Sequence, residues 1–381
     1  MTTALEYEVR PYEEGDEAGI VELLSLALPG WPGFDLGVST VEHWEWKFGG
    51  PDGSLVSVAE SGGAVVGCSH VILCRCIVGG EELLLGNGLD VAVHPDFRKR
   101  GIFNAMTEQR MEMMRDRGVS LAFWSTSNPI LKGKWDREST PFPRPILDYV
   151  KVRDVGLQLR AMPVGNPWLW RMGYSLVRAA NSVSNAFRGA PGGRVRVDGL
   201  ESFDEDVDRL WEEVSRGCGF VAVRNMDYLN WRYCDPRAGK FEVRGAVDGG
   251  LVGYSVLSVN KAHEDYPVGY IVDIQAEPDR PDTLDALISD AVTFFDARGV
   301  NLVNCLVVKG SPLGRALGRR GFLNSRVRFH LAYDALGSGD PLGSASGPFH
   351  FCFGDRDSLP MRRPSRDFQA NGLVGVGGRA S

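Results

Sequence analysis

The chain has 381 residues, so two domains are expected, because a single hydrophobic core rarely grows beyond about 250–300 residues. Hydrophobic residues make up 43% and charged residues 24% of the chain, which is typical of a globular protein and excludes a disordered or fibrous one. The formal net charge of -7 argues against a general nucleic-acid binder, so no nucleic-acid partner is expected.

The seven cysteines lie at irregular spacings and form no C-x-x-C pair, which indicates reduced thiols and gives no reason to expect a metal site. The first residues show no basic segment followed by an apolar one. The sequence also holds no apolar run of the roughly 18 residues that a membrane span requires. We therefore expect a cytoplasmic protein without a membrane partner.

In chain order, residues 6–11 alternate like an edge strand, and residues 20–28 have the apolar spacing of a helix. The segment that follows is expected to be a loop. It is rich in aromatic residues, which either cap a core or line a ligand cleft. The substrate-binding candidates in this segment are Trp31, Trp44 and Trp46.

The pattern then changes to a period of two, which predicts three successive strands separated by Gly-rich hairpin turns. An amphipathic helix, another strand and a helix-starting turn follow. The predicted strands are 54–60, 64–78 and 81–93, the helix is 102–117, the next strand is 119–124, and the turn is 125–129.

The stretch from Leu89 to Met106 reads as a strand, a basic loop and the start of a helix. The first N–H groups of a helix have no partner within the helix, and the helix dipole favours negative charge at this end. Arg98, Lys99 and Arg100 add positive charge, and Gly101 allows close backbone approach. This order predicts a binding site for a phosphorylated ligand.

Arg98-Lys-Arg-Gly101-Ile-Phe103 resembles the Gln/Arg-x-x-Gly-x-Gly/Ala motif of the GNAT superfamily of acyl-CoA-dependent N-acyltransferases, with Phe103 where Gly or Ala is usual. The preceding Val91-Ala-Val93-His-Pro95 resembles the fourth strand of that family and its exit. The resemblance implies that the loop amides bind the pyrophosphate of acetyl-CoA or another acyl-CoA, while the pantetheine arm pairs beside the strand. The cofactor-binding residues that it implies are Val91, Ala92, Val93, Arg98, Lys99, Arg100, Gly101, Ile102, Phe103 and Asn128.

An internal repeat indicates that the fold occurs twice. Trp46-Lys-Phe-Gly-Gly-Pro51 matches Trp231-Arg-Tyr-Cys-Asp-Pro236, and Asp90-Val matches Asp273-Ile. The second copy differs where the anion site should lie, because residues 277–284 contain two aspartates and two prolines but no glycine. We therefore expect a catalytic first copy and a structural or substrate-binding second copy.

The sequence indicates the residues that transfer protons less directly than it indicates the cofactor-binding residues. Transfer to an amine needs a base, and Asp90 lies where many GNAT enzymes place a carboxylate, although it also fits a structural carboxylate at a strand end. His43 and His70 are alternative catalytic candidates with a suitable intrinsic pKa. The tyrosine that serves many relatives as an acid should fall near Trp135, where this sequence has none.

The predicted fold is mixed α/β (α+β), with two tandem GNAT-like domains, each a mostly antiparallel twisted sheet flanked by helices. The expected ranges are an N-terminal domain at 1–163, a helical linker at 164–193, a C-terminal domain at 194–336, a flexible bridge with one more strand at 337–359 and a disordered tail at 360–381.

The predicted activity is N-acyl transfer, acetyl first of all, to a primary amine of an amino sugar, an amino acid or a secondary metabolite, by a monomer or a homodimer. Two alternatives stay open. One is an aminoacyl-tRNA-dependent transferase with doubled GNAT domains. The other is a non-catalytic acyl-CoA sensor or scaffold.

Overall fold

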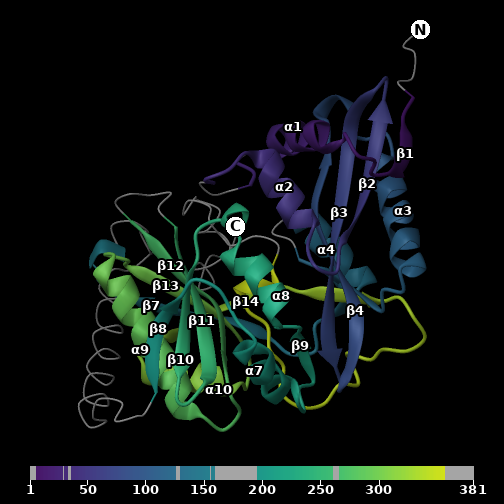
Figure 1. The fold of residues 1–381 in the computed structure, drawn as a ribbon. Helices are drawn as coiled ribbons and strands as arrows, with labels where there is room; N and C mark the ends of the chain where they lie inside the picture. Colours follow the sequence, from purple (N-terminus) through teal and green to yellow (C-terminus); the bar gives the residue numbers. More distant parts are fainter. Residues whose placement is uncertain are drawn as a thin grey trace, which may run out of the picture.

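The computed structural model describes residues 6–28, 30–32, 36–125, 129–154, 156–158, 195–260 and 266–356. Within them the chain forms two bodies, each a mostly antiparallel sheet flanked by helices (Figure 1). This confirms the predicted fold class. The linker helix expected at 164–193 lies outside the described residues. Among the described helices, none is long and apolar enough to cross a membrane.

The first sheet contains the predicted antiparallel meander. Its strand order is β1-β2-β3-β4-β5-β15-β6, and β9 pairs with β3 at its side. The strands are β1 (Glu8–Pro11), β2 (Ser54–Ser61), β3 (Ala64–Val78), β4 (Glu81–Val93), β5 (Leu121–Trp124), β6 (Thr140–Pro141), β9 (Phe220–Ala222) and β15 (Ala332–Ala335). The helices around it are α1 (Glu17–Ala27), α2 (Thr40–Phe48), α3 (Ile102–Asp116) and α4 (Pro129–Glu138), with a 3-10 turn η1 (Pro95–Phe97) before α3.

Helix α2 occupies part of the segment that was expected to be a loop, so that prediction was wrong. The helix begins with a capping box, in which Ser39 accepts a hydrogen bond from the amide of Glu42 and the Glu42 side chain accepts one from the amide of Ser39. His43, Trp44 and Trp46 are therefore held on a rigid element, and all three side chains are buried.

The second sheet repeats this architecture in the order β14-β7-β13-β12-β11-β10-β8. Its strands are β7 (Ile146–Val152), β8 (Arg196–Leu200), β10 (Glu242–Val247), β11 (Leu251–Asn260), β12 (Val268–Ala276), β13 (Leu302–Val308) and β14 (Leu323–Phe329). The helices are α7 (Asp206–Ser215), α8 (Met226–Leu229), a π-helical turn η2 (Asn230–Cys234), η3 (Pro236–Ala238), α9 (Pro281–Ala297), α10 (Pro312–Arg319) and η4 (Phe353–Asp355).

The two sheets exchange a strand with each other. β7 follows the first copy in the chain but lies in the second sheet, between β13 and β14. β15 follows the second copy but lies in the first sheet, between β5 and β6. The domain ranges expected from the sequence stay a prediction, and each of the two large ranges contains a strand that pairs in the other sheet. Neither sheet is complete without the other half of the chain.

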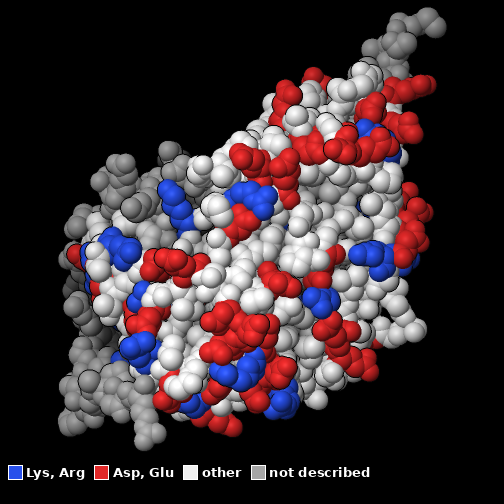
Figure 2. Space-filling model, in the orientation of Figure 1, with Lys and Arg blue, Asp and Glu red and all other residues white. Residues whose placement is uncertain are grey.

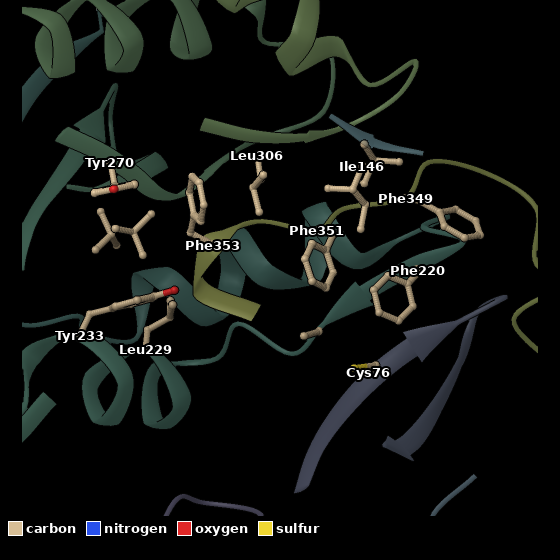
Figure 3. Close-up of a cluster of buried hydrophobic side chains, with 14 of the residues drawn as sticks. Cys76, Ile146, Phe220, Leu229, Tyr233, Tyr270, Leu306, Phe349, Phe351 and Phe353 are labelled. Carbon is tan, nitrogen blue, oxygen red and sulfur yellow. The ribbon is translucent and has the colours of Figure 1, made fainter. Parts of the chain in front are cut away.

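A shared hydrophobic core fills the space between the sheets (Figure 3). Residue 349 forms a single parallel bridge with Phe220, and the chain then turns into η4. Phe349, Phe351 and Phe353 insert between side chains from both sheets. The C-terminal segment 349–355 therefore lies at the centre of the molecule and contributes to holding its two halves together.

Candidate acyl-CoA site and interdomain pocket

Strand β4 separates from β5 partway along its length. Its pairing with β5 covers only Leu85 to Gly88, with Gly88 opposite Trp124. Its register with β3 then shifts, because Leu89 lies opposite His70 while Ala92 lies opposite Cys68. β4 therefore has two residues opposite one residue of β3, which is a β-bulge, and within this bulge Asp90 has a φ of 41°. Among the described strands, the edge of β4 from Leu89 to Val93 has no partner on the β5 side.

This open edge leads directly to the start of α3. Lys99 and Gly101 have φ values of 64° and 89°, so the loop turns sharply before the helix begins. Arg98 Nε donates a hydrogen bond to the carbonyl of Val93 at 3.3 Å, which fixes the loop against the end of the strand. Ile102 is 1% exposed and anchors the first turn of α3. The first-turn amides are thereby presented in a row beside the strand edge.

The cofactor residues implied by the sequence therefore lie together, since Val91 to Val93 form the strand edge and Arg98 to Phe103 form the loop and helix start. Arg100 stacks its guanidinium 5.5 Å from the ring centroid of Phe97 and donates to the Asp96 carbonyl. Asn128 lies outside the described residues. The role of these residues in cofactor binding remains a prediction.

The second copy keeps the turn but not the binding surface. Asp279 has a φ of 62° at the position of Lys99, and proline stands at residue 281 in place of the glycine. Arg280 makes ion pairs with Asp248 at 2.9 Å, Asp282 at 3.2 Å and Glu277 at 3.7 Å. Carboxylates thus surround the N-terminus of α9, where an anion would have to bind.

Asp90 is held in a buried ion pair. Its Oδ2 lies 2.7 Å from Lys47 Nζ and accepts a hydrogen bond from Trp31 Nε1 at 3.1 Å. The two charged side chains are 7% and 10% exposed. Burial by itself would raise the pKa of Asp90, but Lys47, His70 and Trp31 outweigh it, so this pKa lies below its usual value. Such a carboxylate is a weak proton acceptor at neutral pH.

The two candidate histidines are also committed to contacts within the fold. His70 is fully buried, accepts a hydrogen bond from Trp44 Nε1 at 3.1 Å, and donates through Nδ1 to the carbonyl of Asp90 at 2.8 Å. His43 Nδ1 lies 2.8 Å from the carbonyl of Arg237. Burial lowers the pKa of each histidine to about 4. These contacts favour positioning roles, and catalytic roles for both residues stay predictions.

A pocket opens between the two sheets, because residues from both bodies line it. Its wall contains Trp46 and Lys47 from the first copy and their repeat counterparts Trp231 and Arg232 from the second. The remaining lining includes Ile72, Cys74, Cys76, Asn87, Phe123, Ser125, Phe220, Ala222, Tyr228, Leu331, Phe351, Gly354, Asp355 and Arg356. The pocket therefore combines aromatic surface with cations and a few hydrogen-bonding groups.

Of the three tryptophans predicted to bind substrate, Trp46 lines this pocket. Trp44 packs in the core of the first body against Phe48, and Trp31 contacts Asp90. Sequence reasoning missed Lys47 and Arg232 as pocket residues. Their basic side chains directly follow the two repeated tryptophans, and this feature of the repeat could have identified them as pocket residues.

Comparison with known proteins agrees with this geometry. Residues 8–134 match the family model described as an acetyltransferase (GNAT) domain. The N-terminal part of this chain is a GNAT domain. Its matched residues include the β4 edge, the basic loop and α3, which are the elements of the candidate acyl-CoA site described above.

Solved structures show that the tandem GNAT fold extends over most of the chain. A probable N-acyltransferase from Enterococcus faecalis V583 superposes with a TM-score of 0.60 at 10% identity, covering 87% of this chain and 73% of that one. A tandem GNAT protein from the clavulanic acid biosynthesis pathway gives 0.51 at 14% identity, covering 88% and 100%. Saccharomyces cerevisiae N-myristoyltransferase with bound myristoyl-CoA gives 0.55 at 12% identity, covering 88% and 85%.

No curated protein matches the sequence. At the identities of the solved structures the likeness shows the fold alone. Together, the GNAT domain and the fold support acyl transfer in general, with an acyl-CoA as the co-substrate.

Proposed function

We propose that this protein transfers an acyl group, acetyl in the first instance, from acyl-CoA to a primary amine of a small molecule. The observation that carries the proposal is the continuity of the open β4 edge with the glycine turn at the start of α3. The pyrophosphate would lie on the first-turn amides, near Arg98 and Arg100. The pantetheine arm would pair with Val91 to Val93, which directs the thioester toward the bulge at Asp90.

The acceptor would occupy the interdomain pocket. Asn87 on β4 and Ser125 after β5 line it at the point where these two strands separate, so an amine in the pocket can approach a thioester that lies in the gap. Trp46 and Trp231 offer flat apolar surface, and Arg232 offers positive charge. These features favour an amine with an apolar or aromatic body and an anionic group, such as an amino acid, while amino sugars and amine-bearing secondary metabolites remain candidates.

In the reaction, the neutral amine nitrogen would attack the thioester carbon, the carbon–sulfur bond would break, and the proton lost from nitrogen would pass to the leaving sulfur, so that CoA departs as the thiol. The low pKa of Asp90 disfavours it as the group that takes the amine proton. We assign Asp90 a positioning role instead, in which it holds Lys47 in the pocket wall next to the reacting atoms. Positive charge at that point would stabilise the oxyanion that forms on the thioester carbonyl.

The surface charge favours a tRNA-dependent transferase less than an acyl-CoA-dependent one. On the face shown in Figure 2, acidic side chains gather over the N-terminal body near α1, and basic ones are scattered among them. Binding a polyanion requires clustered positive charge. A non-catalytic acyl-CoA sensor would share the cofactor site, so only turnover separates it from an enzyme.

The deciding experiment measures thiol release from acetyl-CoA with a library of primary amines, followed by mass spectrometry of the acylated product. Amino acids, amino sugars and aromatic amines form the first set, and longer acyl-CoAs are then compared. Binding of one CoA per chain together with amine-dependent thiol release would support the proposal. CoA binding without turnover of any amine would favour the sensor, and no CoA binding would refute both.

A further inference from the structure

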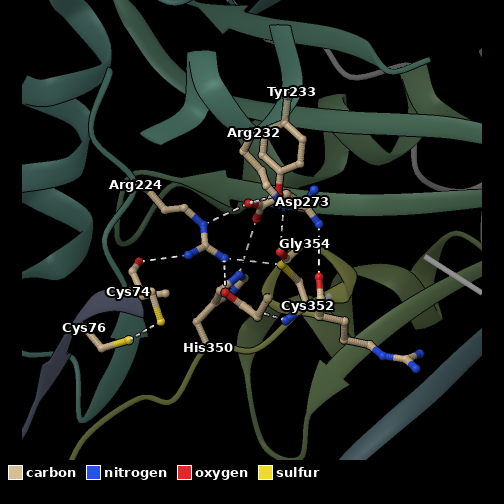
Figure 4. Close-up of polar contacts among 12 residues, drawn as sticks. Cys74, Cys76, Arg224, Arg232, Tyr233, Asp273, His350, Cys352 and Gly354 are labelled. Atoms are coloured by element: carbon tan, nitrogen blue, oxygen red, sulfur yellow. Dashed lines mark hydrogen bonds and ion pairs between the residues drawn. The ribbon is translucent and has the colours of Figure 1, made fainter. Parts of the chain in front are cut away.

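Three side chains with metal-binding atoms converge in the second body, away from the acyl-CoA site. Asp273 comes from β12, and His350 and Cys352 come from the C-terminal segment that inserts between the sheets (Figure 4). Asp273 Oδ1, His350 Nε2 and Cys352 Sγ all lie within 4.8 Å of one another. Carboxylate oxygen, imidazole nitrogen and thiolate sulfur are the three donor types that proteins use to bind zinc.

Two of these atoms are buried without a hydrogen bond. Within the described residues, Asp273 Oδ1 and His350 Nε2 make no hydrogen bond of normal geometry; they lie 3.5 Å from each other, as an ion pair when the imidazole is protonated. This distance exceeds a normal hydrogen bond. It agrees with the edge of a zinc tetrahedron, which is about 3.4 Å for two ligands that each lie about 2.1 Å from the metal.

The other contacts of Asp273 leave only Oδ1 available. Oδ2 accepts hydrogen bonds from Arg224 Nε at 2.8 Å, from Tyr233 at 3.0 Å and from Tyr254 at 3.4 Å. These donors fix the carboxylate so that its second oxygen faces His350. Such outer contacts are what orient a carboxylate ligand toward a metal.

The sulfur accepts two hydrogen bonds that a thiolate ligand would keep, although burial raises the pKa of the free Cys352 thiol, so a bound cation would have to displace its proton. Cys352 Sγ accepts hydrogen bonds from Arg224 Nη2 at 3.4 Å and from the backbone amide of Asp355. Arg224 in turn pairs with the carboxylates of Asp273 and Asp355. With a divalent cation present, its two charges would balance the thiolate and one carboxylate, while Arg224 would balance the other. The local charge would then be neutral.

We propose that Asp273, His350 and Cys352 bind one zinc ion. Three protein ligands leave one tetrahedral position for water, and the His350 side chain is 18% exposed, which offers a route for the metal. The ion would fasten the C-terminal segment to β12 of the second sheet. Because Gly354 and Asp355 of the same segment line the interdomain pocket, the metal would also fix one wall of that pocket.

The test uses the full chain, purified without chelators, and measures zinc by elemental analysis and by titration with a chromogenic zinc indicator. Wild-type protein should hold one zinc per chain. Replacing zinc with cobalt should give a thiolate-to-cobalt charge-transfer band. His350→Ala and Cys352→Ser should each weaken zinc binding at least tenfold, and Cys352→Ser should abolish the charge-transfer band.

Cys218→Ser is the matched control, because it removes a cysteine outside the cluster and should leave zinc binding unchanged. Circular dichroism checks that each variant folds, and His350→Gln serves in place of His350→Ala if that variant fails. Zinc that binds equally to wild type and the cluster variants would overturn the proposal, as would a wild-type protein that takes up no zinc or shows no cobalt–thiolate band.

Discussion

Trp46 and Trp231 stack on each other with ring centroids 5.4 Å apart and ring planes 28° from parallel. Each indole Nε1 donates a hydrogen bond to the backbone carbonyl of the other residue, at 2.8 and 3.0 Å. The two residues occupy the same position in the two sequence copies, 185 residues apart. Their reciprocal contact therefore marks a local two-fold relation between the halves, at the wall of the pocket.

This contact should show energetic coupling between the two halves. Trp46→Phe and Trp231→Phe each remove one hydrogen bond of about 1 kcal/mol and disturb the stack, so each should lower the free energy of unfolding measured by urea denaturation. The double variant should lose less than the sum of the two. Trp211→Phe, outside this contact, serves as the control. Strictly additive effects would show that the stack does not couple the copies.

The sequence predicted the strand, the loop and the helix of the candidate acyl-CoA site because their determinants are local. A strand, a basic loop with Gly101 and an amphipathic helix are adjacent in the chain, so backbone geometry follows from short-range pattern alone. The repeat likewise predicted that Trp46 and Trp231 are equivalent, although it could not predict that they touch.

Other features depended on distant parts of the chain. β7 and β15 are ordinary short strands, and which sheet each joins is decided by packing across the shared core. The partner of Asp90 is Lys47, which comes from a helix that precedes three strands. Phe351 lines a pocket built from both halves. Periodicity cannot predict such contacts, because it reports only which face of an element is apolar.

The glycine turn can be tested against a matched position on the same helix. Gly101 at the start of α3 and Gly118 just after its end have φ values of 89° and 77°, so Gly101→Glu and Gly118→Glu introduce the same charge at similar backbone strain. Only Gly101→Glu places a carboxylate where the pyrophosphate would lie. Calorimetry should show CoA binding weakened at least tenfold in Gly101→Glu and within about twofold of wild type in Gly118→Glu. Equal losses would indicate a general stability effect.

The second copy should not bind CoA. Its helix α9 begins at Pro281, and Arg280 beside it is neutralised by three carboxylates. A calorimetric titration should therefore give one CoA per chain, and Arg280→Ala should leave both affinity and stoichiometry unchanged, because Arg280 binds only groups of its own chain. A stoichiometry of two, or loss of CoA affinity in Arg280→Ala, would contradict this assignment.

The Lys47–Asp90 pair should matter for both stability and turnover. Asp90→Asn leaves the buried ammonium of Lys47 without its counter-charge, which should cost about 3–5 kcal/mol in the free energy of unfolding. Turnover should fall while CoA affinity stays close to wild type, since the pair lies at the pocket and not at the pyrophosphate.

Asp52→Asn is the control for this change, because it breaks the more exposed pair with Arg75 and should cost about 1 kcal/mol or less. The double variant Lys47→Met/Asp90→Asn should recover part of the stability, since no buried charge is then left unpaired, but it should not recover turnover. Full activity of Asp90→Asn would remove the pair from the mechanism.

Acid should destabilise the fold through its two buried histidines. Burial lowers the pKa of His43 and His70 to about 4, below the value of about 6.5 expected in the unfolded chain. Between these values the unfolded state binds protons that the folded state does not, so the cost of keeping each histidine neutral is absent above pH 6.5 and grows as the pH is lowered toward 4. Asp148 acts in the opposite direction, because burial raises its pKa to about 7 and its protonation in the folded state adds stability over the same range. Each histidine should account for about 3 kcal/mol of this loss.

Urea denaturation at a series of pH values measures the effect. His70→Gln should remove about half of the loss that the histidines cause between pH 7 and 4, and His43→Gln should remove a similar share, because each variant deletes one of the two histidine proton-binding differences. The variants will be less stable than wild type at pH 7, so the slope against pH is compared and not the absolute value. An unchanged slope in both variants would mean that the acid sensitivity between pH 7 and 4 arises from groups other than these histidines. Asp90 does not contribute in this range, because its lowered pKa keeps its carboxylate charged until stronger acid.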